Sequence, residues 1–519
     1  MASGGPVGAQ RLGAEAARQF RRSVDLAVLV FADLDPPRLP GKFLGEGASL
    51  ARSQEDAEPP ADPIDAISRA FAEHGGEAYG ERVSQLDHAL QCAELAAAEG
   101  AGYRPCLRCR PERAPGFASV DAASRLVGAA IAGIEEHAVS NGRVGDLAAS
   151  LGVTDRHLRR VTEAELGVSP VELAQTQKLL LAKRLLGETS LKLTDIAFAS
   201  GFGSVRRFNA LFKARYGLNP RSLRRAAAAT RGLTCQLDFR PPLAWDDVLA
   251  YLKLRAVPGV EWVDATHYRR TAAIGDARGW IGVSLAKTGL ALEVEVSPTL
   301  APVIGAVMVR VKQLFDLGAS PDAVHALLSQ DPLLAPAVKR VPGLRVPGAF
   351  DGFELAVRAV LGQQVSVKAA TTMAGRWAAA FGEPIATPWP ELGRLAPTAV
   401  RMLEVAEHEI GALGVIGSRA RCLMGLARAV TERRVVLSLA ANVEEQIGNL
   451  LELPGVGPWT AQYIAMRALH WPDAFPDGDL MLQRAAGTGR KELLARAEAW
   501  RPWRAYATHY LWRTLGVHP

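Results

Sequence analysis

The sequence predicts a multidomain, mainly α-helical protein with a tandem helix-turn-helix, a small α+β domain and an all-α domain that contains a helix-hairpin-helix. Three observations predict this fold class. The chain has 519 residues, enough for three to four domains of ordinary size. A pair of short helices occurs twice between residues 140 and 225. All ten tryptophans lie at Trp245 or later, which marks a module boundary near residue 235.

Composition excludes several classes of protein. Hydrophobic residues make up 49% and charged residues 22%, as in a packed globular chain. No stretch approaches the roughly 18 uninterrupted apolar residues of a membrane helix, and no basic and apolar leader opens the chain. Five cysteines are too few for a disulfide framework. We therefore expect a cytoplasmic, nucleoid-associated protein. We expect it to be a monomer and to have no membrane partner.

Residues 1–116 contain one candidate for metal binding, the pair Cys106 and Cys109. A structural zinc ion needs four ligands, and only Cys92 and His88 lie near this pair. The sequence around the pair resembles the second half of the zinc-binding, methyl-accepting domain of Ada proteins. In that family an upstream cysteine pair completes the site and supplies the methyl acceptor, and this chain lacks it. We expect a degenerate Ada-like region with an incomplete zinc site and no methyl transfer.

Residues 117–230 repeat a helical pattern at an offset of 49 residues. Asp146-Leu147-Ala148 and Gly152-Val153 return as Asp195-Ile196-Ala197 and Gly201-Phe202. Each copy has a short apolar helix, a glycine at the turn and a capping hydroxyl, Thr154 or Ser204, that opens a second helix. The periodicity between the copies predicts a long linking helix over 171–186. The pattern predicts two helix-turn-helix units.

The same segment is strongly basic. Between residues 140 and 225 there are 15 Lys and Arg against 7 Asp and Glu, a local charge of +8. The segment resembles the AraC-type DNA-binding domain, whose two recognition helices meet successive major grooves about 34 Å apart. The alternative is a helical bundle with a solvated basic face. The candidate DNA contacts are Arg156, Arg159 and Arg160 on the first recognition helix, and Arg206, Arg207 and Asn209 on the second.

Residues 235–345 are predicted to form the small α+β domain. Alternating residues predict a strand over 235–239, a helix over 246–255, and further strands over 271–274 and 280–296, with Gly289 at a turn. Residues 346–519 are predicted to be helical, with breaks at Pro and Gly.

The helical part contains a helix-hairpin-helix. The segment Leu453-Pro454-Gly455-Val456-Gly457-Pro458-Trp459 lies between helical stretches over 443–452 and 459–469. Gly455, Val456 and Gly457 would present backbone N–H groups at a helix N-terminus, which suits one DNA phosphate. Asp479 follows Trp459 by twenty residues and opens another helix.

This spacing is similar to that of the helix-hairpin-helix DNA glycosylases, and further segments narrow the resemblance to the 3-methyladenine DNA glycosylase II group over residues 235–519. The segments are Arg240-Pro241-Pro242, Arg255-Ala256-Val257-Pro258-Gly259, Leu314-Phe315-Asp316-Leu317, Leu361-Gly362-Gln363-Gln364-Val365 and Trp500-Arg501-Pro502-Trp503. The resemblance implies an N-glycosidic hydrolase for alkylated purines in double-stranded DNA, fused to a promoter-binding regulator. The alternative is a regulator whose glycosylase half senses damage with little excision.

The resemblance also implies roles for single residues. Asp479 would be the catalytic carboxylate, and Trp459, Tyr463 and Trp512 would line the base pocket. Gln364 would fill the gap that the flipped base leaves. Family members that also cut the backbone have a lysine where this chain has Trp459, so the resemblance implies a monofunctional enzyme without a cofactor. No cysteine follows Cys422, so the iron–sulfur cluster of some relatives is not expected.

Overall fold

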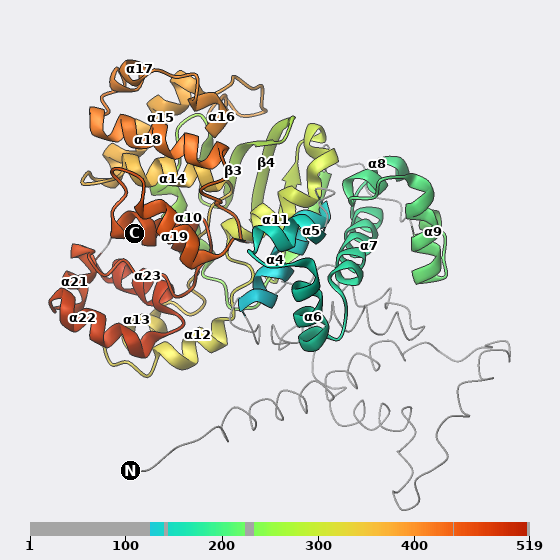
Figure 1. Cartoon of the computed structure of the whole chain (residues 1–519), viewed down its shortest axis with the longest axis horizontal. Coiled ribbons are helices and arrows are strands. Elements are labelled where there is room, and N and C mark those ends of the chain that lie inside the picture. Colours follow the sequence, from blue (N-terminus) through green and yellow to red (C-terminus); the bar gives the residue numbers. More distant parts are fainter. Residues whose placement is uncertain (1–124, 140–143, 224–232, 440, 516–519) are drawn as a thin grey trace, which may run out of the picture.

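The structure of the chain is a computed structural model that describes residues 125–139, 144–223, 233–439 and 441–515. The helix-turn-helix domain lies at one end, an antiparallel sheet in the middle and the remaining helices at the other end (Figure 1). The described part is mainly helical with one small sheet, which confirms the predicted fold class. None of its helices is long and apolar enough to cross a membrane.

Six α-helices and a short 3-10 helix form the helix-turn-helix domain. Thr154 Oγ1 accepts a hydrogen bond from His157 N at 3.2 Å, and Ser204 Oγ accepts one from Arg207 N at 3.2 Å, so both predicted caps are confirmed. The linking helix is slightly longer than predicted. The elements are α4 (Arg125–Val139), α5 (Val144–Ser150), α6 (Asp155–Leu166), α7 (Pro170–Glu188), α8 (Leu193–Ala199), α9 (Val205–Tyr216) and η2 (Pro220–Leu223).

The two helix-turn-helix units are buried differently. The first has a core of its own, in which Leu147, Leu158 and Leu166 pack with α4. The apolar residues of the second, among them Phe208 and Phe212, belong to a core that continues into the sheet and α11. The second unit is therefore part of one packed body with the α+β domain.

The α+β domain is built on five antiparallel strands in the order β1-β5-β4-β3-β2. The strands are β1 (Leu233–Asp238), β2 (Glu261–Val263), β3 (His267–Ile274), β4 (Ala277–Leu285) and β5 (Ala291–Val296). All strands except β2 were predicted, and Gly289 lies at the β4–β5 turn with φ +70°. Helices α10 (Trp245–Arg255) and α11 (Ile304–Leu314) contribute to the same core as the sheet, and η3 (Pro298–Val303) precedes α11.

The edge strand β1 lies against the linking helix α7. Glu188, the last residue of α7, accepts a hydrogen bond at Oε2 from the backbone N–H of Gln236 at 3.3 Å. Because an edge strand otherwise presents unpaired backbone groups, this contact satisfies one of them and fixes the helix-turn-helix domain to the sheet.

The remaining helices form two further cores on either side of the hairpin. One gathers α14, α15 and α18, and the other gathers α12, α13 and α23. Trp500 and Trp503 are buried in the second core. The elements are α12 (Pro321–Leu328), α13 (Ala335–Arg340), α14 (Gly352–Leu361), α15 (Val367–Phe381), α16 (Ala399–Met402), α17 (Glu407–Gly411), α18 (Gly417–Thr431), α19 (Val443–Leu451), α20 (Pro458–Arg467), α21 (Leu480–Ala486), α22 (Arg490–Ala497), η4 (Glu498–Trp500) and α23 (Arg504–Thr514).

Candidate active site and DNA-binding surfaces

The Asp479 carboxylate is fixed by three hydrogen bonds. Asp479 is the N-cap of α21, and its Oδ1 accepts from the backbone N–H groups of Met481 at 2.8 Å and Leu482 at 3.0 Å. Its Oδ2 accepts from the indole Nε1 of Trp459 at 2.8 Å. The residue is only 9% exposed. Since each carboxylate oxygen can accept two hydrogen bonds, Oδ2 retains one acceptor position for another partner.

Three aromatic rings extend from this carboxylate. Trp459 and Tyr463 stand one turn apart on α20, and their rings are nearly parallel, with centroids 5.2 Å apart and an interplanar angle of 7°. The ring of Trp512, on α23, lies 6.4 Å from that of Tyr463 at 49°. The structure thus brings together Asp479 and the three aromatic residues that the resemblance assigned to one pocket. Electron-rich ring faces beside a carboxylate suit a cation.

The hydroxyl of Tyr463 is held by Arg467, a residue that the sequence analysis did not single out. Nη1 of Arg467 donates to Tyr463 Oη at 2.8 Å and to Tyr251 Oη at 2.5 Å. Burial raises the pKa of Tyr463, but the positive charges of Arg467, Arg255 and Arg358 outweigh burial and lower this pKa to about 8. Tyr463 is therefore a phenol that ionises more readily than an ordinary tyrosine.

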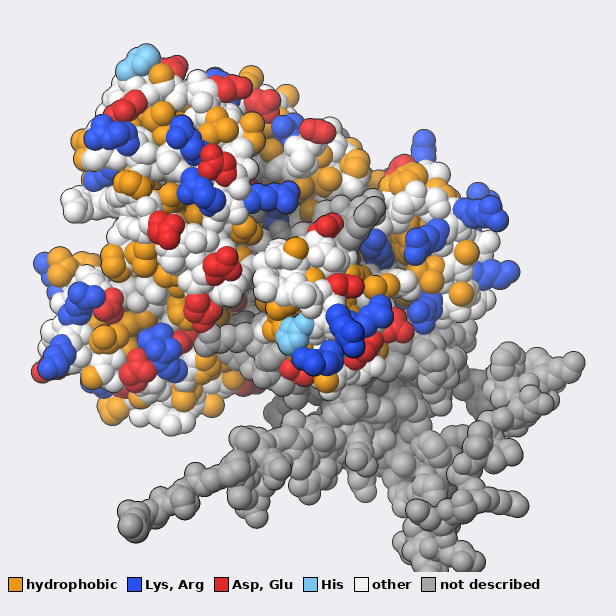
Figure 2. All heavy atoms as spheres, viewed as in Figure 1, with side chains coloured by type: hydrophobic (Ala, Val, Ile, Leu, Met, Phe, Trp, Pro, Cys, Tyr) orange, Lys and Arg blue, Asp and Glu red, His pale blue; other side chains and the backbone are white. Residues whose placement is uncertain are grey.

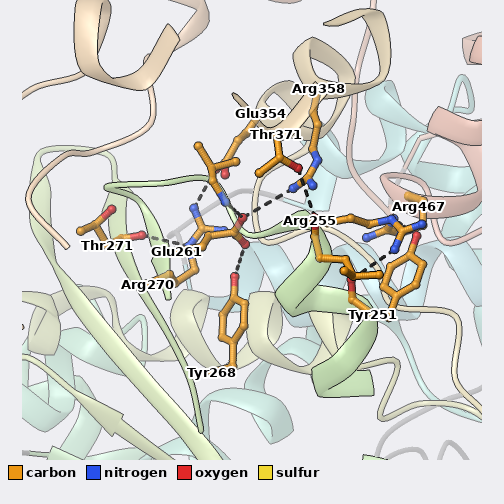
Figure 3. Close-up of polar contacts among 12 residues, drawn as sticks. Tyr251, Arg255, Glu261, Tyr268, Arg270, Thr271, Glu354, Arg358, Thr371 and Arg467 are labelled. Carbon is orange, nitrogen blue, oxygen red and sulfur yellow. Dashed lines mark hydrogen bonds and ion pairs between the residues drawn. The ribbon is translucent and has the colours of Figure 1, made fainter. Parts of the chain in front are cut away.

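A second set of buried charges joins the α+β domain to the helical domain (Figure 3). Arg270 of β3 donates through Nη2 to Glu354 of α14 at 2.7 Å. Glu261 of β2 accepts a hydrogen bond from Tyr268 and lies 3.6 Å from Nη1 of Arg358. Because these paired charges cross the boundary between the two domains, removal of one partner would leave the other buried and unpaired.

The hairpin has a glycine at the position where the backbone requires one. Gly455 has φ +93°, whereas Gly457, the N-cap of α20, has φ −93°. Val456 is buried in the core beneath the hairpin. Only Gly455 is therefore needed for the backbone conformation of the hairpin. At Gly457 the space in front of the α20 N-terminus is open, since no atom lies within 4 Å of a Cβ built on that residue.

The turn between α14 and α15 is attached to the hairpin. Gln363 Nε2 donates to Gly455 O at 2.8 Å and to Thr460 Oγ1 at 3.1 Å. The next residue, Gln364, is exposed and has a left-handed backbone with φ +54°. Its predicted role, filling the gap of a flipped base, requires an exposed side chain beside the hairpin, and the role itself stays a prediction.

Asp477, the nearest rival to Asp479, has a different partner. Its Oδ2 accepts hydrogen bonds from Arg490 Nε at 3.0 Å and Nη2 at 2.8 Å. The Asp477 carboxylate thus pairs with the exposed side chain of Arg490, whereas Asp479 accepts a hydrogen bond directly from the Trp459 ring. The carboxylate at the pocket is therefore that of Asp479.

The candidate DNA contacts of the helix-turn-helix domain are all exposed. They lie on α6 and α9, the second helix of each unit. Figure 2 shows Lys and Arg side chains gathered where Figure 1 places these two helices. Arg156, Arg159 and Arg160 lie on α6, and Arg206, Arg207 and Asn209 lie on α9. Their contact with DNA stays a prediction.

The candidate zinc ligands Cys106 and Cys109 lie outside the described residues. In the described part, no group of three or more His, Cys, Asp or Glu side chains is placed to hold a metal ion. Its two cysteines, Cys235 and Cys422, are buried free thiols in separate cores.

Three models of known families match parts of the chain. A model of the AlkA N-terminal domain matches residues 234–351, a helix-turn-helix domain matches 147–226, and the HhH-GPD superfamily of base excision DNA repair proteins matches 357–491. A solved structure of 3-methyladenine DNA-glycosylase from Archaeoglobus fulgidus covers 53% of this chain and 96% of its own, at 19% identity and a TM-score of 0.47.

Two curated relatives extend these matches. The DNA-3-methyladenine glycosylase 2 of Escherichia coli is 36% identical over 54% of this chain and 98% of its own length. The probable bifunctional transcriptional activator/DNA repair enzyme AlkA of Mycobacterium tuberculosis is 39% identical over 82% of this chain and 87% of its own length. The chain therefore belongs to the AlkA family of bifunctional proteins, in which a helix-turn-helix regulator is fused to a DNA repair enzyme.

Proposed function

We propose that the protein hydrolyses the N-glycosidic bond of alkylated purines, 3-methyladenine among them, in duplex DNA, and that its helix-turn-helix domain binds promoters of the alkylation response. One observation carries the catalytic part. The Asp479 carboxylate lies within hydrogen-bonding distance of Trp459, whose ring stacks on that of Tyr463. A fixed anion thus adjoins a surface suited to a cationic base.

The reaction follows from the charge of the damaged base. Methylation at N3 makes adenine cationic, so the electron pair of the breaking C1′–N9 bond neutralises the departing base and no general acid is required. Positive charge develops on the sugar instead. A carboxylate fixed by three hydrogen bonds can stabilise that charge without reorganising. Water then adds to C1′ and releases a proton.

The position of Trp459 supports hydrolysis without backbone cleavage. A Schiff base needs an amine nucleophile. The indole at this position offers only an N–H group, and that group donates to Asp479. We propose a monofunctional, monomeric enzyme that leaves an intact abasic strand.

Release of methylated bases from alkylated duplex DNA by the purified full chain tests the proposal. We expect free 3-methyladenine in the supernatant, strand breaks only after alkali, and no covalent adduct with borohydride. The absence of free base with normal binding to damaged DNA would instead support a regulator that only senses damage. One observation favours a regulator that senses damage. The core that is continuous between the second helix-turn-helix unit and the α+β domain connects the DNA-binding domain physically to the glycosylase domains.

The promoter-binding part is tested by salt dependence. Changing Arg156 and Arg159 together to Ala removes two exposed cations from α6. If each arginine contacts one phosphate, the plot of log affinity against log salt concentration should become less steep, and the magnitude of its negative slope should fall by about 1.8. Unchanged affinity and slope would indicate that the basic residues of α6 form a solvated surface that does not contact DNA.

A further inference from the structure

Arg467 is a buried cation whose hydrogen bonds all go to uncharged acceptors. The residue is 4% exposed. Besides the two tyrosine hydroxyls, it donates through Nη2 to Gly348 O at 3.0 Å and through Nε to Pro347 O. The charge of Glu261 favours the Arg467 cation at longer range, but within the described residues no carboxylate hydrogen-bonds to this guanidinium. Burying a charge with so little direct compensation is costly.

The surroundings of Tyr463 are rich in positive charge. Arg467 reaches it from its own helix α20, and Tyr251 and Arg255 approach from α10. Arg358 approaches from α14, and Glu261 of β2 is the carboxylate nearest to that guanidinium in this group. On α23, the ring of His509 lies 5.3 Å from those of Tyr251 and Trp512. Figure 3 shows the arginines and Tyr251 converging between α10 and the helical domain.

This arrangement presents an electrostatic problem for the proposed substrate. A cationic base on the face of Tyr463 would be close to three guanidinium groups, and like charges repel strongly where water is excluded. The Tyr463 hydroxyl accepts a hydrogen bond from Arg467, whose guanidinium carbon lies 5.7 Å from the centroid of the Tyr463 ring. A negative charge on that oxygen would pair with Arg467 and make the ring a better partner for a cation.

We propose that Arg467 is a positioning residue that fixes Tyr463 in the base pocket, and that the Tyr463 hydroxyl, as a phenolate, selects positively charged bases over neutral ones. This proposal rests on the proposed function, because it assumes that a damaged base enters this pocket. In the ionisation step the phenolic O–H bond breaks, the oxygen keeps the electron pair and the proton passes to bulk water. The lowered pKa of Tyr463, about 8, places this step slightly above neutral pH.

Ultraviolet absorbance of phenolate tests the ionisation without any catalysis. The full chain should show one tyrosine that titrates with a midpoint of about 8, and Tyr463→Phe should lack it. Arg467→Gln should move the midpoint upward, and Arg467→Lys should partly restore it. Arg434→Gln is the matched control, because Arg434 is exposed and pairs only with Glu432 in a surface contact. A titration unchanged by Tyr463→Phe overturns the proposal.

Base excision tests the selection. As the pH rises between about 7 and 9, the KM for a cationic lesion should fall relative to that for an uncharged lesion, and Tyr463→Phe should abolish this trend. In Arg467→Gln we expect KM for the cationic lesion to rise about tenfold with a smaller change in kcat, as for a lost binding contact. Equal changes for both lesions overturn the proposal.

Two further outcomes remain distinguishable. If the unaltered chain releases no base, the proposed function fails, while the absorbance titration still decides whether Arg467 controls Tyr463. If Arg467→Gln does not fold, Tyr463→Phe decides, since it removes one hydroxyl and leaves Arg467 its contacts with Tyr251, Pro347 and Gly348.

Discussion

One carboxylate oxygen of Asp479 has a structural role, and the other has the chemical role that we propose. Its Oδ1 caps α21, and its Oδ2 faces the indole of Trp459. A cap needs only an oxygen acceptor, which Asn supplies about as well as Asp. Catalysis by charge needs the full carboxylate. The two roles can therefore be separated by one substitution.

Asp479→Asn should reduce excision of 3-methyladenine by orders of magnitude. Its amide can retain the cap, although an NH₂ group facing the Trp459 N–H would lose one hydrogen bond, a cost of about 1 kcal/mol. Binding to damaged DNA should persist, because the hairpin is unchanged. Single-turnover excision and a binding assay measure both quantities.

Asp477→Asn is the matched control. It breaks an ion pair with Arg490, whose side chain is 60% exposed, so stability should change by less than about 1 kcal/mol and excision should stay near normal. Near-normal excision by Asp479→Asn together with loss in Asp477→Asn would transfer the catalytic role to Asp477. Full activity in both variants would contradict the mechanism.

His470 should make the protein less stable in acid. Burial and the charge of Arg467 lower the pKa of His470 to about 4 from the ordinary value of 6.5. The fold therefore favours the neutral ring, and its contribution to stability is present above pH 6.5 and is lost as the pH falls towards 4. Urea unfolding should show a loss of about 2 kcal/mol from this residue between about pH 7 and 5.

His470→Asn removes this titration and suits the backbone, because His470 has φ +51° and Asn tolerates that region. The variant should lose less free energy of unfolding than the unaltered chain over the same pH interval. An equal loss in both proteins would show that His470 is not responsible.

The residues of the candidate site differ in how far the sequence could predict them. Trp459 and Asp479 flank one continuous stretch of chain, so motif and spacing pointed to both. Arg467 was missed because its partners are distant: Tyr251 is 216 residues away and Pro347 is 120 away. One signal was available, since Arg467 follows Tyr463 by four residues and i, i+4 residues share a helix face.

At the level of elements, the hairpin depends on one of its two glycines. Gly455→Ala would put a side chain in the left-handed region, and its Cβ would lie 3.1 Å from Cys422 Cβ. We expect a loss of about 1–2 kcal/mol in the free energy of unfolding. Gly457→Ala, with open space and negative φ, should cost less than about 1 kcal/mol. Equal costs, measured by urea unfolding, would contradict this reading of the turn.

Strand prediction succeeded where alternation was long enough to detect. β1 follows a strict alternation of buried and partly buried residues, and Gly289 marks the hairpin turn between β4 and β5. β2 has only three residues, of which only Val263 is buried, so no period-2 pattern can be recognised. Its pairing with β3 is a short hairpin in which Val263 lies opposite Tyr268, and the Asp264 carboxylate accepts a hydrogen bond from His267 N at the turn.

At the scale of the whole molecule, we propose a division into 117–230, 235–345 and 346–519. A fragment of residues 235–519 should still excise damaged bases, because Asp479 and the aromatic residues all lie within it. It would also expose apolar surface that α7, α8 and α9 cover in the full chain, so its unfolding midpoint in urea should be lower. Loss of excision would show that the regulator is needed to hold the pocket.

The second helix-turn-helix unit shares its core with the sheet, and the Arg270–Glu354 pair links the sheet to the helical domain. We therefore expect this unit and the proposed base pocket to turn together. A protein bound to a promoter through this unit would therefore hold its pocket at a set direction relative to the DNA axis. Nearby lesions would reach the pocket only when the intervening duplex presents the correct side. Repair beside a bound promoter should then rise and fall with the distance to the lesion, with a period of about 10.5 base pairs.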